Sequence, residues 1–139
     1  MIIFNTENTT MPDFNQSRVA DWIIKVTEAH NKKVGTLNYI FTDDDNILNV
    51  NRQFLQHDYY TDIITFDYSK RGVISGDMYI SVDTVKSNSE LQNVDYGQEL
   101  MRVIIHGVLH LCGINDKAPG EREIMEAHEN EALALLPQQ

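Results

Sequence analysis

Residues 98–113 read QELMRVIIHGVLHLCG, and this segment decides the fold of the chain. Apolar residues cover most of the circumference of the helix that it predicts, a pattern typical of a helix buried inside a domain. The polar residues that interrupt the pattern on one face are Glu99, Arg102, His106 and His110. At about 100° per residue they fall within roughly 80° of one another and form a single stripe. Because buried helices avoid polar groups that are neither paired nor used, we expect this stripe to face a cleft.

The two histidines of the stripe are four residues apart, so their imidazoles project from one face of the helix. This spacing lets His106 and His110 chelate one transition-metal ion. Gly113 can end the helix in a left-handed turn, after which the chain can bring Asp116 back toward the imidazoles. The sequence therefore predicts a metal site formed by His106, His110 and Asp116. The alternative interpretation is a pair of hydrogen-bonded core histidines.

The spacing is similar to that of zinc proteases with the pattern H-E-x-x-H-x-x-G-x-x-H. Those enzymes place a general-base glutamate directly after the first histidine. This chain has Gly107 at that position, so peptide hydrolysis by their route would lack its base.

The segments around this helix predict the element order βαβαββααα. Hydrophobic periodicity, turn residues and helix caps define the expected elements. We expect strands at 2–5, 35–42, 61–68 and 74–81, and helices at 17–30, 43–55, from 83, 96–112 and from 119 to before 137. The acids at 43–45 complement the dipole of a first helical turn better than they form a metal site. The expected fold class is α+β (α/β-like), with a small mixed four-stranded sheet packed by about five helices in a zinc metalloprotein.

Length and composition indicate one globular domain over residues 1–139. The chain has a mass of 16.0 kDa, 42% hydrophobic residues and 23% charged residues, which is ordinary for a globular protein. A lone Cys112 cannot form an internal disulfide. The first residues lack the pattern of a signal peptide, and no apolar run approaches the roughly 20 residues of a membrane span. We expect a cytoplasmic protein.

The net charge is −10 and the isoelectric point is about 4.7. A strongly acidic balance argues against passive, charge-driven binding to nucleic acid or to anionic membranes.

The motif HGVLHLCG, preceded by Glu99 and followed by Asp116 and Met125, resembles the signature H-G-x-L-H-L-x-G-Y-D-H. That signature marks the YbeY-type family of bacterial endoribonucleases, also called rRNA maturation factors. HDYYTDIITF (57–66) is similar to the family's K-D-x-P-T-D-V-L-S-F, and SGDMYIS (75–81) is similar to its L-G-D-I-x-I. These segments lie between 51 and 131 in the order of the family.

The resemblance implies a single-strand-specific endoribonuclease with one zinc ion per chain. It implies a role in 3′-end maturation of small-subunit rRNA and in ribosome quality control. The implied partners are single-stranded RNA and ribosomal or assembly-factor proteins.

Carried over residue by residue, His106 and His110 match the family's first two metal-binding histidines, and Glu99 matches an upstream acid. The third histidine of the family falls on Asp116, whose carboxylate can also ligate zinc. His128 is the alternative third ligand, although its acidic neighbours favour a solvated or core-edge histidine.

A functional arginine of the family falls on Leu55 in this chain. Arg52, one helical turn earlier, and Arg102, on the polar stripe, are the candidates to bind a scissile phosphate as a planar fork. An ion pair with Glu99 is the alternative role of Arg102. Phe66 and Tyr60 are the candidates to stack on an unpaired base.

The leading hypothesis is metal-dependent RNA cleavage, with Arg102, Glu99 and Arg52 as candidate catalytic residues. One alternative is a zinc metallohydrolase that acts on peptides or small molecules. Another is a non-catalytic assembly factor stabilised by zinc. Three protein ligands leave a coordination position open, which favours a catalytic site. Together with the net charge of −10, this hypothesis predicts weak RNA binding by the isolated protein and delivery by a partner.

Overall fold

The computed structural model describes residues 1–56 and 61–136. The described strands are β1 (Ile2–Thr6), β2 (Lys33–Thr42), β3 (Ile63–Asp67) and β4 (Val73–Ser81). The described helices are α1 (Gln16–Ala29), α2 (Asp44–Leu55), α3 (Val82–Gln92), α4 (Tyr96–Leu111) and α5 (Glu121–Ala134). None of these helices is long and apolar enough to cross a membrane.

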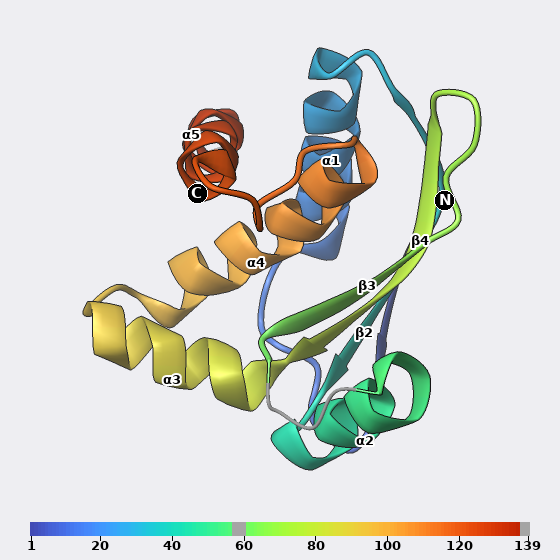
Figure 1. Cartoon of the computed structure of the whole chain (residues 1–139). Helices are drawn as coiled ribbons and strands as arrows, with labels where there is room; N and C mark the ends of the chain where they lie inside the picture. Colours follow the sequence, from blue (N-terminus) through green and yellow to red (C-terminus); the bar gives the residue numbers. More distant parts are fainter. Residues whose placement is uncertain (57–60, 137–139) are drawn as a thin grey trace.

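The strands form a mixed sheet with the order β1-β2-β4-β3. β1, β2 and β4 run parallel, and β3 pairs antiparallel with β4 at one edge. Figure 1 shows α1, α3, α4 and α5 on one side of the sheet and α2 on the other. The predicted fold class, with its small mixed sheet and about five helices, is confirmed in the described residues.

The main core lies between the sheet and the helices α1 and α4. It contains Trp22, Leu37, Tyr39, Phe41, Met78, Ile104, Ile105 and Val108, all at most 1% exposed. Two polar atoms in this core are satisfied by backbone carbonyls: Tyr39 Oη donates to Ile104 O at 2.9 Å, and Trp22 Nε1 donates to Ala132 O at 2.8 Å. These bonds tie the sheet to α4 and α1 to α5 without leaving a buried donor unpaired.

A smaller cluster covers part of the opposite face of the sheet. Ile47 and Val50 of α2 pack there with Ile64 of β3. Asp43 caps α2 by accepting from Asn46 N at 2.9 Å, and Asp44 links α2 to the start of α3 by accepting from the hydroxyls of Ser81 and Thr84 at 2.6 Å each. This arrangement agrees with the predicted role of the acids at a first helical turn.

The last helix begins later than the sequence predicts. α5 starts at Glu121 instead of at residue 119, because its N-cap Gly120 has φ 83° and interrupts the helical backbone. Residues 118–121 form a closed turn in which Glu121 N donates to Ala118 O at 3.0 Å and Ala118 N donates to Glu121 Oε1 at 2.9 Å. Proline is favoured at a first helical position, which is why the sequence predicts a start at Pro119. Here Gly120, the next residue, sets the start of α5.

Gly107 lies where α4 approaches the sheet most tightly. A Cβ atom at this position would lie 2.6 Å from Met78 Sδ and 3.0 Å from Ile63 Cδ1. Such contacts are far shorter than ordinary van der Waals distances, so any residue other than glycine requires a shift of the Met78 and Ile63 side chains or of the helix. A glutamate at position 107 would also point into this packed interface, which agrees with the absence of the protease-type base.

We predict that Gly107→Ala lowers the free energy of unfolding by about 1–3 kcal/mol, because the added methyl overpacks the contact with Met78. The control is Gly97→Ala in the exposed first turn of the same helix, where a Cβ would meet only the Asp95 carboxylate, at 3.0 Å. Helix propensity makes that control neutral or more stable by up to about 1 kcal/mol. Urea unfolding of both variants measures the difference, and equal stability of the two would contradict the tight contact.

Candidate metal centre

Helix α4 places His106 and His110 one turn apart on the edge of the core. Their rings meet edge to face, with centroids 4.6 Å apart and an interplanar angle of 80°. Both side chains are partly exposed, at 20% and 28%. The apolar circumference of α4 is buried, so the two imidazoles are held on its one open face.

The chain reverses directly after α4 and returns to the histidines. Gly113 has φ 100°, a left-handed conformation that favours glycine. Gly113 N donates to His110 O at 2.9 Å, and Ile114 N donates to Leu109 O at 3.1 Å. These bonds close the end of the helix and set the direction of the chain toward Asp116.

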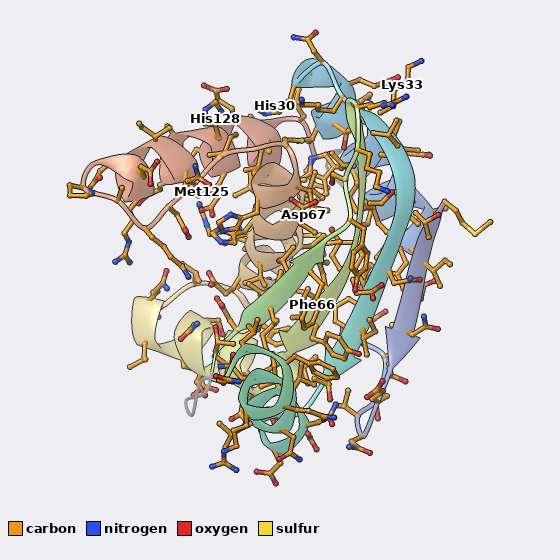
Figure 2. All side chains as sticks on the ribbon, turned by 45° about the vertical axis from the view of Figure 1, so that its right-hand side comes forward. His30, Lys33, Phe66, Asp67, Met125 and His128 are labelled. Carbon is orange, nitrogen blue, oxygen red and sulfur yellow. The ribbon has the colours of Figure 1, made fainter. Side chains whose placement is uncertain are left out.

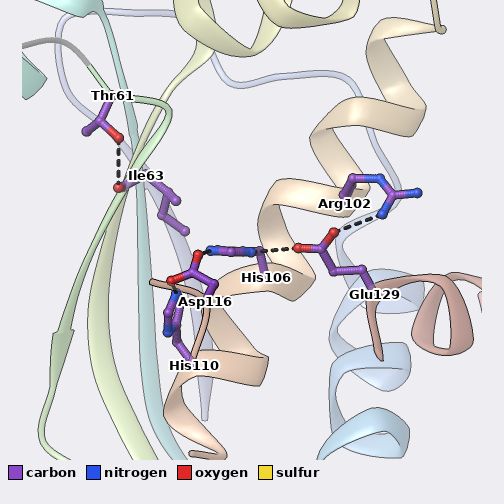
Figure 3. A network of polar contacts seen from close by, with 7 residues as sticks. All are labelled: Thr61, Ile63, Arg102, His106, His110, Asp116 and Glu129. Atoms are coloured by element: carbon purple, nitrogen blue, oxygen red, sulfur yellow. Dashed lines mark hydrogen bonds and ion pairs between the residues drawn. The ribbon is translucent and has the colours of Figure 1, made fainter. Parts of the chain in front are cut away.

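Asp116 lies between the two imidazoles (Figure 3). Its Oδ2 is 3.3 Å from His106 Nε2, and its Oδ1 is 3.4 Å from His110 Nε2. One ligand atom from each of the three residues can be chosen so that all lie within 4.8 Å of one another. The structure thus brings together the three residues that the sequence predicts as metal ligands.

The three side chains fit a zinc ion chemically. Imidazole nitrogens and a carboxylate oxygen are ordinary zinc ligands, and three of them leave a fourth position open. Asp116 Oδ1 is buried and accepts no hydrogen bond from any described residue. Since a buried carboxylate oxygen costs free energy when it lacks a partner, a cation at this point would satisfy it.

Glu129 of α5 joins the site from the other side of His106 (Figure 3). Its Oε2 lies 2.6 Å from His106 Nδ1, and its Oε1 accepts from Arg102 Nη1 at 2.8 Å. Arg102 Nη2 also donates to Asn130 Oδ1, at 2.9 Å. Arg102 therefore pairs with Glu129 in place of the predicted alternative partner Glu99.

Sequence reasoning did not find Glu129. Its signal lies in the pattern of α5, where Met125, Glu129 and Ala132 are the buried residues. The spacing of these positions defines the inner face of the helix, so an acid among them needs a partner. Only the packing of α5 against α4 identifies that partner as His106 and Arg102.

The charges of the network act on one another. Burial opposes protonation of His106, but the hydrogen bond and charge of Glu129 outweigh it and raise the pKa of His106. Burial would raise the pKa of Glu129, but its bonds with His106 and Arg102 lower it. The pKa of His110 is lowered by burial and by the charge of His106. The two imidazoles therefore differ in their affinity for a proton.

A cavity of about 1250 Å³ opens beside two of the three candidate ligands, His106 and Asp116. Asp62, Glu99 and Arg102 lie in its lining together with His106 and Asp116. Burial raises the pKa values of both Asp62 and Glu99, and each further carboxylate nearby raises them more. Asp62 was absent from the predicted site, although it belongs to the T-D pair of the segment 57–66.

Two further predicted residues, Phe66 and Arg52, lie away from this cavity. Phe66 packs edge to face against Phe54 of α2 and Tyr79, with centroids 5.9 and 6.1 Å apart, and so lies on the α2 side of the sheet (Figure 2). Arg52 belongs to α2, on the same side. Tyr60 lies outside the described residues. The structure thus separates Phe66 and Arg52 from the cleft that they were expected to border.

His128 is also separate from the three candidate ligands. Its ring faces His30 at the end of α1, with centroids 5.2 Å apart (Figure 2). In the described part of the chain, the one group of three residues with metal-ligand spacing contains Asp116 and lacks His128.

Comparisons with known proteins identify one family. The family profile described as Endoribonuclease YbeY matches residues 2–137. A protein of that name from Phocaeicola vulgatus is 61% identical over 136 residues, which is 98% of this chain and 99% of the relative. Another, from Parabacteroides distasonis, is 57% identical and covers 99% of this chain and 97% of its own length.

A solved structure shares the fold. The solution structure of a Thermotoga maritima protein aligns with a TM-score of 0.65 at 24% identity, over 96% of this chain and 90% of that protein.

We predict that the wild-type protein binds one zinc ion and that His110→Ala and Asp116→Ala each weaken binding more than about 100-fold. Loss of a residue that only orients a ligand typically costs 10–100-fold in metal affinity, so loss of a direct ligand costs more. The control is His128→Ala, which removes a histidine outside the group. Competition with a chromophoric chelator measures the affinities, and an unchanged affinity in His110→Ala would exclude this ligand set.

Proposed function

The chain belongs to the family described as Endoribonuclease YbeY, and we propose that it cuts single-stranded RNA at a zinc ion held by His106, His110 and Asp116. As a member of that family it is an endoribonuclease, a hydrolase whose substrate is RNA. The observation that carries the metal-dependent proposal is the convergence of two imidazole nitrogens on the Asp116 carboxylate, one at each oxygen, beside a wide cavity.

A zinc ion bound there supplies Lewis-acid stabilisation of negative charge on a phosphate oxygen of the RNA. The ligand set supports a catalytic centre more than a structural one, because structural zinc ions are usually held by four protein ligands. In this proposal His106, His110 and Asp116 hold the ion and leave room for substrate.

Arg102 is the candidate to bind and orient the scissile phosphate. Its side chain is 32% exposed and lines the cavity, while Glu129 and Asn130 each take one N–H of its guanidinium. A guanidinium carries five N–H donors, so others remain for a phosphate oxygen. The contacts with α5 hold the fork in one orientation, which lowers the entropy that is lost when phosphate binds.

Glu99 and Asp62 are the candidates to hold or move a proton. Both line the cavity, and Glu99 is only 6% exposed. Burial raises the pKa values of both carboxyl groups toward the range in which a carboxylate accepts a proton near neutral pH. In its ionised form, either group can take a proton at a carboxylate oxygen from the nucleophile, whether that is water or the ribose 2′-OH.

In this proposal Arg52 and Phe66 act on flanking nucleotides and not on the scissile phosphate. Both lie on the α2 side of the sheet, Phe66 in the edge strand β3 and Arg52 in α2. There they can contact RNA that leaves the cavity across β3, but they cannot touch the scissile phosphate. Stacking on an unpaired base by Phe66 therefore concerns flanking nucleotides.

We propose that the substrate in cells is the precursor of small-subunit rRNA, cut near its 3′ end in the cytoplasm. The net charge of −10 supports dependence on ribosomal or assembly-factor proteins, because non-specific affinity for RNA rests on cationic contacts. Such partners would bring the RNA to the enzyme.

We predict that zinc-loaded wild-type protein cleaves a single-stranded RNA that carries the precursor 3′ end, and that His110→Ala reduces cleavage to the level of the metal-free protein. Denaturing gel analysis of end-labelled RNA measures the rates, with His128→Ala as the control. Equal cleavage by wild type and His110→Ala would refute the role of this centre.

We also predict that the isolated protein binds naked single-stranded RNA with a dissociation constant of about 10⁻⁴ M or weaker at physiological salt, the weak end of non-specific binding. Fluorescence anisotropy measures this constant. Purified precursor small-subunit particles are expected to be cut faster than the same rRNA after deproteinisation. Faster cleavage of the deproteinised RNA would argue against delivery by partner proteins.

A further inference from the structure

Glu129 connects two residues of α4 that are one turn apart. One carboxylate oxygen lies 2.6 Å from His106 Nδ1, and the other accepts from Arg102 at 2.8 Å. The residue is 7% exposed, so water contributes little to its hydrogen bonding. Both of its oxygens are therefore committed to α4, and the carboxylate has little freedom to turn.

This contact decides which nitrogen of His106 carries the hydrogen. A neutral imidazole has one N–H donor and one acceptor nitrogen, and a carboxylate can only accept. A separation of 2.6 Å between Nδ1 and Oε2 thus requires the hydrogen on Nδ1. The lone pair is then left on Nε2, the atom that lies 3.3 Å from Asp116 Oδ2.

His110 lacks this support. In the described part of the chain, no carboxylate makes the corresponding contact with its Nδ1, and its nearest acid is Asp116 on the Nε2 side, at 3.4 Å. Among the described residues, α4 and the contact with Asp116 set the orientation of His110, whereas α5 also sets that of His106. His106 is therefore held in its metal-binding orientation more firmly than His110.

We infer that Glu129 is a positioning residue that holds His106 in the tautomer and ring orientation needed for metal binding, and that Arg102 and Asn130 hold Glu129 in turn. A carboxylate that accepts from the distal nitrogen of a metal-binding histidine raises the basicity of that ligand and fixes its ring. The docking of α5 on α4 thereby becomes part of the metal centre. This inference rests on the proposed metal centre at His106, His110 and Asp116.

The test is Glu129→Gln, which keeps the size of the side chain and removes its charge. An amide can either accept from Nδ1–H or donate to an Nδ1 lone pair, so it no longer selects one tautomer. The control is Glu131→Gln, which removes the same charge from an exposed position of the same helix. Arg102→Met is a second variant, because it loosens Glu129 without touching His106.

We predict a 10–100-fold weaker zinc affinity for Glu129→Gln, a smaller loss for Arg102→Met, and an unchanged affinity for Glu131→Gln. In ¹⁵N–¹H spectra of the histidine side chains, zinc-loaded wild type shows His106 with its hydrogen on Nδ1. Metal-free Glu129→Gln at pH 8.5 shows a mixture of both tautomers at His106. The His110 signals of this variant match those of metal-free wild type at the same pH. Chelator competition gives the affinities without any activity measurement.

Three results would overturn the inference. An affinity of Glu129→Gln within twofold of wild type removes the positioning role and leaves the metal centre intact. A wild-type His106 that carries its hydrogen on Nε2 also removes the positioning role. This measurement needs no variant, so it decides the question even if Glu129→Gln fails to fold. A wild-type protein that binds no zinc removes both the inference and the proposed centre.

Discussion

The close packing of α4 on the sheet at Gly107 is the constraint on which the rest of the structure depends. The missing side chain lets the helix rest directly on Met78 and Ile63, so nearly all of its circumference is buried. This packing fixes the orientation of α4, so the polar stripe of the helix faces α5 and the cavity. The position of both histidines is therefore a consequence of helix packing, and the same packing excludes a side chain at the protease-base position.

The polar stripe is then satisfied from two sides by segments that follow it in the chain. The turn after α4 brings Asp116 to the Nε2 atoms, and α5 brings Glu129 to the Nδ1 side of His106. The two acids differ in role because Asp116 lies on the Nε2 side of the His106 ring and Glu129 lies on its Nδ1 side. Glu129 has two close donors, which stabilise its charge, whereas Asp116 has only the longer contacts of 3.3 and 3.4 Å with the imidazoles, which favours a cation between them.

The sequence predicted what depends on local spacing and missed what depends on packing. His106, His110 and Asp116 lie within one helix and its C-terminal turn, so periodicity and one glycine suffice to bring them together. Glu129 is 23 residues from His106, and nothing local relates the two. Phe66 illustrates a second limit: both faces of 61–68 carry an isoleucine, and alternation alone does not say which face meets α4. The order of the elements followed from periodicity and turns, while Gly120 moved the start of α5.

The negative charge of the chain has a specific consequence at the cavity. Seven acidic and three arginine side chains are among its lining residues, so with neutral histidines its wall is negative. A phosphate diester would be repelled from such a wall unless positive charge stood between them. In the proposed function, a divalent ion at the histidines would reduce this excess where the scissile phosphate would lie, and Arg102 would add positive charge along α4. The acidic cavity and the proposed metal centre would thus act together, because a cation held at the histidines would offset the negative wall where RNA has to approach.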